Sequence, residues 1–388
     1  MTVLSSLPFV LMRGGTSKGV FLDGKNLPQD RVALSALLLD VMGSPDRRQI
    51  DGLGGADKLT SKVAIISPSE RQDADIDYLF AQVGIQEPEV DFQINCGNLT
   101  AAAAVYAIEQ GLVAGVGHGL CRVRIHNVNT QRVILADVPM RDGRPEASGD
   151  FQIDGVPGTG APIALDFAQA FGVVTGELLP FGSPTSILQV SGLGAIDVSV
   201  VDGANLVVFV AARSVGMQGT ESPREIDGDA QLVGKLNAIR REVAYRLGMK
   251  AYWDSRVMPS TPFCVVVSPS VTYQNFATGQ HVHAADVDLV CRQFSTGATS
   301  KAMAATVASC TGLAARIPGT VVQQVLAPRA LSKIAVDIGH PSGVISVESQ
   351  LLTDAAGSHR PQSARIFRTA RRLADGTVYL KRHDIAEL

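Results

Sequence analysis

Short apolar runs alternate with glycine-rich turns in the first part of the chain. Residues 9–12 and 20–22 are apolar, and the loop between them, residues 13–19, is rich in glycine and polar groups. This pattern predicts two strands joined by a loop. A helix is expected over residues 29–42, because the Gly-Ser-Pro that follows ends it, and a further apolar strand is expected over residues 63–66. Polar groups that could do chemistry therefore stand at strand edges.

Two alanine-rich segments of the chain look alike. Each begins at a glycine that follows a polar residue, and each continues for several turns with almost no charge. Helices of this composition are too apolar for a solvated face, so both are expected to be buried, each as the axis of its own domain. The predicted helices cover residues 97–110 and 298–315, and their likeness favours an internal duplication.

The length of the chain and a cluster of glycine and proline residues predict two domains. The chain has 388 residues, more than one typical domain, and glycine and proline cluster near residues 180–184. We expect an N-terminal domain over residues 1–182, which residues 375–388 could complete, and a C-terminal domain over residues 183–374. Further strands are expected at residues 128–140, 189–201, 205–211, 265–268 and 344–348.

The composition is that of a compact protein rich in strands and turns. Hydrophobic residues make up 46% and charged residues 18% of the chain, with 38 glycines and 19 prolines. The formal net charge of -3 argues against a general binder of nucleic acids or anionic membranes, since the whole molecule would not attract a polyanion. Any site for an anion must therefore be local.

The five cysteines favour free thiols in a reducing compartment. They are odd in number, widely spaced and without a CxxC pair, so neither a disulfide framework nor a zinc site is suggested. The N-terminus has no basic segment ahead of its short apolar run, and no apolar stretch is long enough to cross a bilayer. We therefore expect a cytoplasmic protein. The cysteines are Cys96, Cys121, Cys264, Cys291 and Cys310.

Cys96 is the first candidate for chemistry. It stands in Asn95-Cys96-Gly97-Asn98, immediately before the first alanine-rich helix, whose dipole and first-turn N–H groups would stabilise a thiolate. A lone cysteine beside an apolar helix is more often an inert core residue, but the polar neighbours Asn95 and Asn98 favour a proton-handling role. The N–H groups of Gly97, Asn98 and Leu99 could also hold a carboxylate or an enolate oxygen.

The start of the second predicted helix offers similar donors. Thr296, Gly297 and Ala298 stand where the first segment has its own helix start. If the two helix starts face each other across a cleft, they line a pocket for a substrate with several carboxylates.

The glycine loop near the N-terminus is a second candidate anion site. Arg13, Thr16, Ser17 and Lys18 could bind a carboxylate through their side chains and backbone. A tight turn with solvated cations is the alternative. The loop is not a nucleotide phosphate loop, because the GxxxxGK[ST] order and the strand-to-helix setting are both missing.

Lys62 is the candidate partner for acid–base chemistry. It follows Ser61 and begins an apolar strand, so an inward side chain would be partly desolvated, which suits proton transfer; the alternative is an exposed lysine at a strand edge. His340 and Ser342, in Gly-His-Pro-Ser-Gly, form another polar turn that could face a ligand. No grouping of His, Asp and Glu has metal-ligand spacing, so we expect no metal.

These motifs resemble those of the methylaconitate isomerase (PrpF) family, which also contains methylitaconate isomerase and 4-oxalomesaconate tautomerase. The resemblance covers nearly the whole chain. It includes Met-Arg-Gly-Gly-Thr-Ser-Lys-Gly in the first loop and Asn-Cys-Gly-Asn before the first alanine-rich helix. The matching segments are residues 12–19, 42–46, 49–55, 60–64, 95–98, 156–162, 317–320, 340–343 and 368–373.

The resemblance implies an α+β fold of the diaminopimelate-epimerase type. Such a fold has two pseudo-symmetric domains, each a curled mixed β-sheet around a central helix, with the active site between them. Racemases and epimerases of this fold use two cysteines, one at each helix start. Here Cys96 corresponds to the first, and Thr296 stands at the expected place of the second. The resemblance assigns the second functional group to Lys62 instead.

The implied reaction is a 1,3-allylic proton shift in an unsaturated di- or tricarboxylate, without a cofactor. We favour Lys62 as the base that starts the shift and Cys96 as its partner. The substrate could be 4-oxalomesaconate, 2-methylaconitate or methylitaconate. Candidate substrate-binding residues are Arg13, Thr16, Ser17, Lys18, Ser61, Asn95, Gly97, Asn98, Thr296, Gly297, Ala298, His340 and Ser342.

Two alternatives stay open. A two-base racemase or epimerase on the same fold is disfavoured by Thr296. A non-catalytic carboxylate-binding accessory protein would tolerate the loss of Lys62 and Cys96. The expected partner is a small polycarboxylate, with neither nucleic acid nor membrane, and a homodimer is left open as the assembly.

Overall fold

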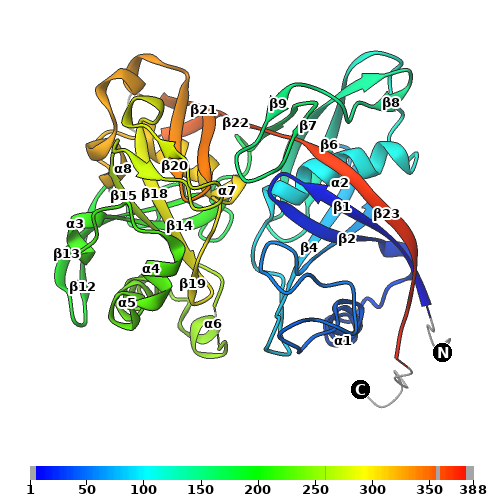
Figure 1. Ribbon diagram of the computed structural model, residues 1–388, viewed down its shortest axis with the longest axis horizontal. Coiled ribbons are helices and arrows are strands. Elements are labelled where there is room, and N and C mark those ends of the chain that lie inside the picture. Colours follow the sequence, from blue (N-terminus) through cyan, green and yellow to red (C-terminus); the bar gives the residue numbers. More distant parts are fainter. Residues whose placement is uncertain (1–5, 258, 355–358, 382–388) are drawn as a thin grey trace. The chain divides into compact units, whose positions relative to one another are not determined.

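A computed structural model describes residues 6–257, 259–354 and 359–381 of the chain (Figure 1). The chain divides into two compact units. Unit 1 comprises Met1–Leu165 together with Arg368–Leu388, and unit 2 comprises Asp166–Phe367. The C-terminal part of the chain therefore returns to the unit in which the chain begins.

The units do not divide the chain where glycine and proline suggested. Residues 182 and 183 fall in a loop inside unit 2, ahead of its first strand β12 (Ser186–Val190), and the returning segment begins at Arg368 rather than at residue 375. Glycine and proline mark turns, whereas a domain division follows the density of contacts.

A mixed sheet forms most of unit 1. Its strands follow the order β23–β1–β2–β3–β4–β6–β7, in which β2–β3 and β4–β6 are parallel and all other neighbours antiparallel. The elements are β1 (Ser6–Gly14), β2 (Ser17–Asp23), η1 (Gly24–Asn26), α1 (Arg31–Met42), β3 (Lys62–Pro68), β4 (Ile76–Val83), β5 (Val90–Asp91), α2 (Gly97–Glu109), β6 (Gly119–Asn127), β7 (Arg132–Arg141), β8 (Arg144–Pro145), β9 (Phe151–Gln152), β10 (Thr159–Gly160), β11 (Ile163–Asp166) and β23 (Ala370–Tyr379).

The helix α2 is the axis of unit 1. Its residues 97–108 are all buried, because alanine and other small side chains let the strands approach from several sides. The helix packs against β1, β2, β7 and β23, among others, and Figure 1 shows it lying among these strands. Phe21 of β2 contacts Tyr106 with ring centroids 5.5 Å apart. This agrees with the prediction of a buried helix over residues 97–110.

The helix α1 covers the opposite face of the same sheet. Leu38 belongs to an apolar cluster that also contains Val20 of β2 and Val63 of β3. Asp30 caps the helix by accepting from Ala33 N at 2.8 Å. Unit 1 is thus a sheet with a buried helix on one face and an amphipathic helix on the other.

Unit 2 repeats the strand directions of unit 1. Its order is β12–β13–β14–β15–β18–β20–β21–β22, with β14–β15 and β18–β20 parallel and the other pairs antiparallel. The helix α7 has the axial position, and α5 covers the other face. The two units are therefore topological repeats, as the twin segments predicted.

The remaining elements of unit 2 have the following bounds. They are β13 (Gly194–Gly203), β14 (Asn205–Ala211), α3 (Ala212–Val215), α4 (Pro223–Gly228), α5 (Ala230–Arg246), α6 (Lys250–Asp254), β15 (Phe263–Pro269), β16 (Tyr273–Gln274), β17 (His281–Val282), η2 (Ala284–Asp286), β18 (Leu289–Ser295), β19 (Ala298–Thr299), α7 (Ala305–Arg316), α8 (Val321–Val325), η3 (Pro328–Ser332), β20 (Ala335–His340), β21 (Gly343–Thr353) and β22 (His359–Arg368).

The second alanine-rich helix begins later than predicted. Thr296 (φ 49°) and Gly297 (φ 70°) form the tight turn of a hairpin between β18 and β19. Two successive positive φ angles suit a two-residue hairpin loop. The helix α7 starts only after Ala304, so the predicted start at residue 298 was wrong. Ala304, not Thr296, holds the position that Cys96 holds in unit 1.

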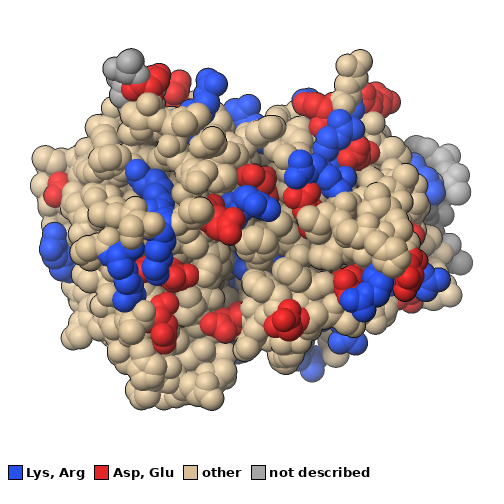
Figure 2. Space-filling model, turned by 90° about the horizontal axis from the view of Figure 1, so that it is seen from above, with Lys and Arg blue, Asp and Glu red and all other residues tan. Residues whose placement is uncertain are grey.

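The surface carries both signs of charge. On the face drawn in Figure 2, acidic and basic side chains are interspersed over a mostly uncharged surface. Among the described residues, no helix is both long and apolar enough to cross a membrane.

Candidate active site

Lys62 and Cys96 meet in the interior of unit 1. Lys62 is the first residue of β3, and Cys96 directly precedes α2 as its N-cap residue. Lys62 Nζ lies 3.6 Å from Cys96 Sγ, and each residue is only 7% exposed. The start of the helix places backbone N–H groups and the positive end of its dipole beside the sulfur. An amine and a thiol in this contact can exchange a proton.

Gln82 holds the side chain of Lys62. The two residues face each other across the β3–β4 pair, so their side chains project from the same face of the sheet. Lys62 Nζ donates to Gln82 Oε1 at 3.0 Å, while Gln82 Nε2 donates to the carbonyls of Ser61 (2.8 Å) and Lys58 (3.2 Å). Because the amide nitrogen is committed to carbonyl oxygens, Oε1 must face the lysine.

We expect the Gln82→Leu variant to lower kcat about tenfold, because the lysine loses the acceptor that orients it toward Cys96. Steady-state kinetics and a thermal melt would check this. The control is Gln324→Leu, since Gln324 donates to a backbone carbonyl in unit 2 and does not touch the lysine. Equal kcat in wild type and Gln82→Leu would contradict the orienting role.

The backbone carbonyl of Cys96 is held by two neighbouring residues. Thr100 donates to it through both its backbone N–H and its hydroxyl, each at 3.0 Å, and the Tyr78 hydroxyl donates at 3.4 Å. Burial, and next the neighbouring Cys96, raises the pKa of Tyr78 well above its ordinary value, so the phenol stays protonated. These contacts fix the backbone from which the thiol projects.

The cysteines of unit 2 are deeply buried. Burial raises the pKa of Cys264 and of Cys291 to about 12, and it also raises the pKa of Cys310. Almost none of these thiols is therefore ionised near neutral pH. Cys96 has Lys62 Nζ at 3.6 Å and the start of α2 beside it.

The glycine loop packs directly on the start of α2. A Cβ at Gly14 would lie 2.2 Å from the backbone oxygen of Asn98, and a Cβ at Gly15 would lie 2.2 Å from Asn98 Oδ1. Gly15 also has a positive φ of 48°. The loop side chains continue the contact, because Asn98 Nδ2 donates to Thr16 Oγ1 at 2.9 Å and to Ser17 Oγ at 3.3 Å. The structure thus brings the two sequence-predicted donor groups together.

We expect Gly14→Ala to destabilise the protein by about 1–3 kcal/mol, because the added methyl group meets backbone that can move only with the helix. The catalytic activity should fall together with the stability. Thermal melts of this variant and of Gly117→Ala would check the prediction, since a Cβ at Gly117 meets open space. Equal melting temperatures for the two variants would contradict it.

Two other predicted residues of unit 1, Arg13 and Ser61, serve the fold. The Arg13 guanidinium donates to the carbonyls of Gly15 and Thr369, each at 3.0 Å, and burial, then the nearby Arg371, lowers its pKa. The Ser61 hydroxyl donates to Val83 O and accepts from Gln49, so its only proton is already used. Ser61 is therefore not a free donor for a ligand.

Lys18 and Asn95 keep groups that a ligand could use. Lys18 Nζ lies beside Gly55, 3.4 Å from where a Cβ on that residue would stand. Asn95 is buried and accepts from Asn127 Nδ2 at 3.1 Å, while its own Nδ2 has no acceptor among the described residues.

The predicted residues of unit 2 are less suited to binding. Thr296, Gly297 and Ala298 belong to a hairpin rather than to a helix start, so the reason to expect free N–H donors there no longer holds. Ser342 Oγ donates to Lys301 O at 2.5 Å, and Ser342 N donates to His340 Nδ1 at 3.2 Å.

Several residues of the site escaped sequence reasoning. Tyr78, Gln82 and Thr100 have no local signal, because their contacts depend on strand register and on helix packing. Arg368 donates from Nε to Asn98 Oδ1 at 3.0 Å. It lies in a segment that carries the family resemblance, residues 368–373, so that signal was available.

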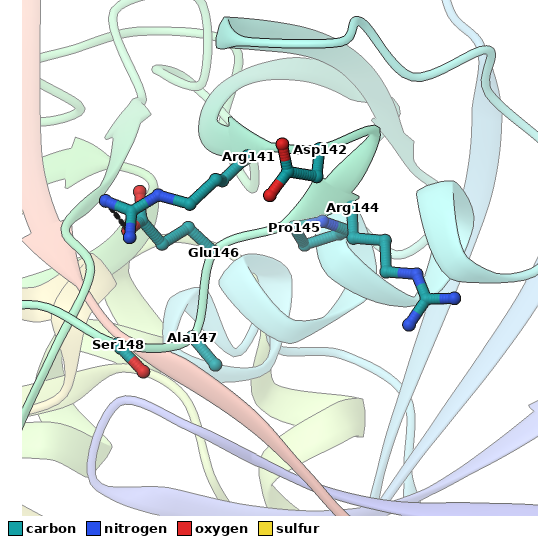
Figure 3. A pocket seen from close by; sticks show the side chains of 7 residues that line it. All are labelled: Arg141, Asp142, Arg144, Pro145, Glu146, Ala147 and Ser148. Atoms are coloured by element: carbon teal, nitrogen blue, oxygen red, sulfur yellow. Dashed lines mark ion pairs between the residues drawn. The ribbon is translucent and has the colours of Figure 1, made fainter.

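Two surface hollows of unit 1 lie apart from these residues. Figure 3 shows the first, in which Arg141 and Glu146 form an ion pair at 2.6 Å. The second is lined by residues that include Asp75 and Arg124, which are also paired, at 2.6 Å. Neither hollow includes Lys62 or Cys96. Among the described residues, no cluster of three or more His, Cys, Asp or Glu could hold a metal ion.

Comparison with known proteins matches the chain along nearly all its length. The sequence model of the PrpF protein family matches residues 4–381. The chain is 45% identical to 3-methylitaconate isomerase of Eubacterium barkeri, over 97% of each sequence. It is 39% identical to 2-methyl-aconitate isomerase of Shewanella oneidensis, over 95% of each, and 37% identical to 4-oxalomesaconate tautomerase of Pseudomonas putida, over 97% of this chain and 96% of that sequence.

Solved structures agree on the fold. A crystal structure of methylitaconate-delta-isomerase has a TM-score of 0.79 and 45% identity, and covers 98% of this chain and 96% of that one. A hydroxyproline epimerase from Agrobacterium vitis has a TM-score of 0.58 at 11% identity, covering 98% and 94%. The fold is therefore of the diaminopimelate-epimerase type, as the family resemblance implied.

Proposed function

Since the chain belongs to the PrpF family and is an allylic isomerase, we propose that it acts on an unsaturated di- or tricarboxylate, with Lys62 and Cys96 as the groups that handle the proton. The contact between Lys62 Nζ and Cys96 Sγ at the start of α2 carries this proposal. It supplies two proton-transfer groups beside the donors that an enolate needs.

The proposed mechanism moves one proton along three carbons. Lys62, as the free amine, removes a proton from the saturated carbon next to the alkene, and the electron pair spreads into the conjugated carboxylate as a dienolate. The backbone N–H groups at the start of α2 stabilise the negative charge. The Cys96 thiol then gives a proton to the far carbon of the allylic system, and the double bond has moved.

The direct contact of the two groups also resets the enzyme. One turnover leaves an ammonium on Lys62 and a thiolate on Cys96. Transfer of one proton across the 3.6 Å contact restores the amine and the thiol. Gln82 accepts from the lysine throughout, so the side chain keeps its direction in both protonation states.

The substrate class follows from the relatives and from the donors of unit 1. The relatives are named for methylitaconate, methylaconitate and oxalomesaconate, which are all unsaturated polycarboxylates. Thr16, Ser17, Lys18 and the start of α2 provide donors for carboxylates of this kind.

Proton NMR in deuterated water tests the function. Each of the three acids is incubated with the enzyme, and we expect at least one to change its alkene signals and to exchange an allylic proton. The proposal would be contradicted if none of the three acids changed its alkene signals or exchanged an allylic proton.

The racemase alternative predicts a different readout. A two-thiol racemase needs a second cysteine at the other axial helix, where this chain has Ala304. Such an enzyme would exchange a proton at a stereocentre and leave the alkene in place. The accessory-protein alternative predicts binding of the acids without any exchange.

The proposal includes a location in the cytoplasm. All five cysteines are buried, free thiols, which suits a reducing cytoplasm. A homodimer is the assembly we would test first, by light scattering of the purified protein.

A further inference from the structure

Asn98 makes three side-chain hydrogen bonds at the start of α2. Its Oδ1 accepts from Arg368 Nε at 3.0 Å, and its Nδ2 donates to Thr16 Oγ1 at 2.9 Å and to Ser17 Oγ at 3.3 Å. Asn98 and Arg368 are 3% and 5% exposed. Both hydrogens of the amide are therefore committed to the two hydroxyls of the glycine loop.

The direction of this chain of bonds is fixed by Arg368. A guanidinium can only donate, so the oxygen of the Asn98 amide must face it and the nitrogen must face the loop. Thr16 and Ser17 must then accept, and each hydroxyl keeps its own proton for another acceptor. Among the described residues, neither hydroxyl donates to any other group.

A second chain of the same kind ends at Asn95. The backbone N–H and the hydroxyl of Thr130 donate to Asn127 Oδ1, at 2.9 and 2.8 Å. Asn127 Nδ2 donates in turn to Asn95 Oδ1 at 3.1 Å. A backbone N–H can only donate, so Asn95 Nδ2 is left as a buried donor, and it has no acceptor among the described residues.

We infer that Arg368 and Asn127 are positioning residues that turn the groups around the start of α2 into donors for a substrate carboxylate. The inference rests on the proposed function for the identity of the carboxylate. Neither residue needs to touch the substrate. Each acts through an asparagine whose amide it orients, so that Thr16, Ser17 and Asn95 all present hydrogens rather than lone pairs.

The orientation has a chemical purpose. A hydroxyl or an amide can face a carboxylate with either a proton or a lone pair, and only the proton attracts it. A site whose hydroxyls can rotate must order them when the ligand binds. A site in which buried donors have already fixed them binds more tightly for the same contacts.

Calorimetric titration with tricarballylate, a saturated tricarboxylate, tests this without turnover. We expect Thr16→Val/Ser17→Ala to weaken Kd at least about tenfold, and Arg368→Met to weaken it by a similar factor. Combining all three changes should weaken Kd no further than Thr16→Val/Ser17→Ala alone, since Arg368 acts through those hydroxyls. Arg368→Lys, which keeps one donor, should recover part of the affinity.

Two further variants test the direction of the bonds. In Asn127→Asp the side chain can no longer donate to Asn95, and we expect Kd to weaken several-fold. In Asn98→Asp the new carboxylate would accept from Arg368 and from both hydroxyls, so the fold should be kept while Kd weakens at least about tenfold. Asn98→Asp replaces Arg368→Met in the test if the Arg368→Met variant does not fold. The controls are Asn275→Asp, in a turn of unit 2 where the Asn275 Oδ1 accepts from Ala277 N, and Arg365→Met on β22, and neither should change Kd.

Kinetics separate positioning from a role in the fold. With a turned-over acid, the Arg368 and Asn127 variants should raise KM and leave kcat and its pH profile nearly unchanged, because Lys62 and Cys96 are untouched. A lower melting temperature with unchanged Kd and KM would overturn the inference. The inference would also be overturned if the effects of Arg368→Met and of Thr16→Val/Ser17→Ala on Kd multiplied when the changes were combined. Failure of the wild-type protein to bind tricarballylate would overturn it as well. Absence of isomerisation with the expected Kd pattern would instead overturn the proposed function alone.

Discussion

Replacement of Lys62 by methionine is expected to lower kcat for the allylic proton shift by about 10³-fold, which is the scale of a general base removed from its site. Methionine keeps the length and most of the apolar packing of the lysine stem. The amine that contacts Cys96 Sγ and Gln82 Oε1 is lost, so no group at this position can take the proton. Steady-state rates with the best of the three acids would measure the effect.

The fold should survive this replacement, because the side chain is buried and methionine is apolar. A thermal melt is therefore part of the test. Lys25→Met is the control, since Lys25 lies on the surface in an ion pair with Asp23. A Lys62→Met enzyme with wild-type kcat would remove the lysine from the mechanism and favour the non-catalytic alternative.

Replacement of Cys96 by serine is expected to lower kcat by about 10²-fold or more, because a hydroxyl is a far weaker acid than a thiol and cannot return the proton at the same rate. Serine is close in size, and its hydroxyl is a favourable side chain at the N-cap position of α2. KM should change little, since the donors around the helix start are unaltered. Rates of product formation and of proton exchange would both be measured.

The two steps can be told apart in this variant. If Lys62 removes the proton and Cys96 returns it, the Cys96→Ser enzyme should still exchange the substrate's allylic proton with solvent faster than it forms product. Cys121→Ser, which alters a buried thiol of β6 in the same unit, should behave as wild type. If Cys96→Ser abolishes exchange and Lys62→Met preserves it, the roles of acid and base are reversed.

Local signals predicted the axis of unit 1 well. Residues 97–108 combine alanines, an absence of charge and a preceding Asn-Cys-Gly, and this composition leaves little choice other than a buried helix with Cys96 at its start. The strand over residues 205–211 was also predicted at its observed bounds, because it is a continuous apolar run that ends at a change of structure.

The second axial helix shows where composition misleads. Residues 298–304 are small and mostly uncharged, like the helix that follows, but Thr296 and Gly297 adopt positive φ angles and send the chain back along β18. Thr-Gly is not among the pairs that favour such a turn, because a β-branched residue rarely adopts a positive φ, so the hairpin had no local signal. The apolar runs over residues 128–140 and 189–201 also each cross a hairpin turn, at residues 128–131 and 191–193.

One further element, the helix α5, was readable from the sequence. Leu232, Leu236, Ile239 and Val243 have the spacing of an amphipathic helix, and Asp229 caps it, so α5 had a clear signal. Gln82, the partner of Lys62, had no such signal, because its contact depends on strand register. Arg368, the partner of Asn98, was marked only by the family resemblance of residues 368–373, because its contact depends on the return of the chain's end to unit 1.

The position of deuterium in the product is the most direct test of the central claim, that Lys62 and Cys96 relocate a proton along an allylic system. The wild-type enzyme is run to partial conversion in deuterated water, and proton and carbon NMR locate the label. The account predicts deuterium at the far carbon of the former allylic system, with the double bond moved, and almost none in the Lys62→Met reaction. Deuterium at a stereocentre with the double bond unmoved, or equal labelling by wild type and Lys62→Met, would contradict it.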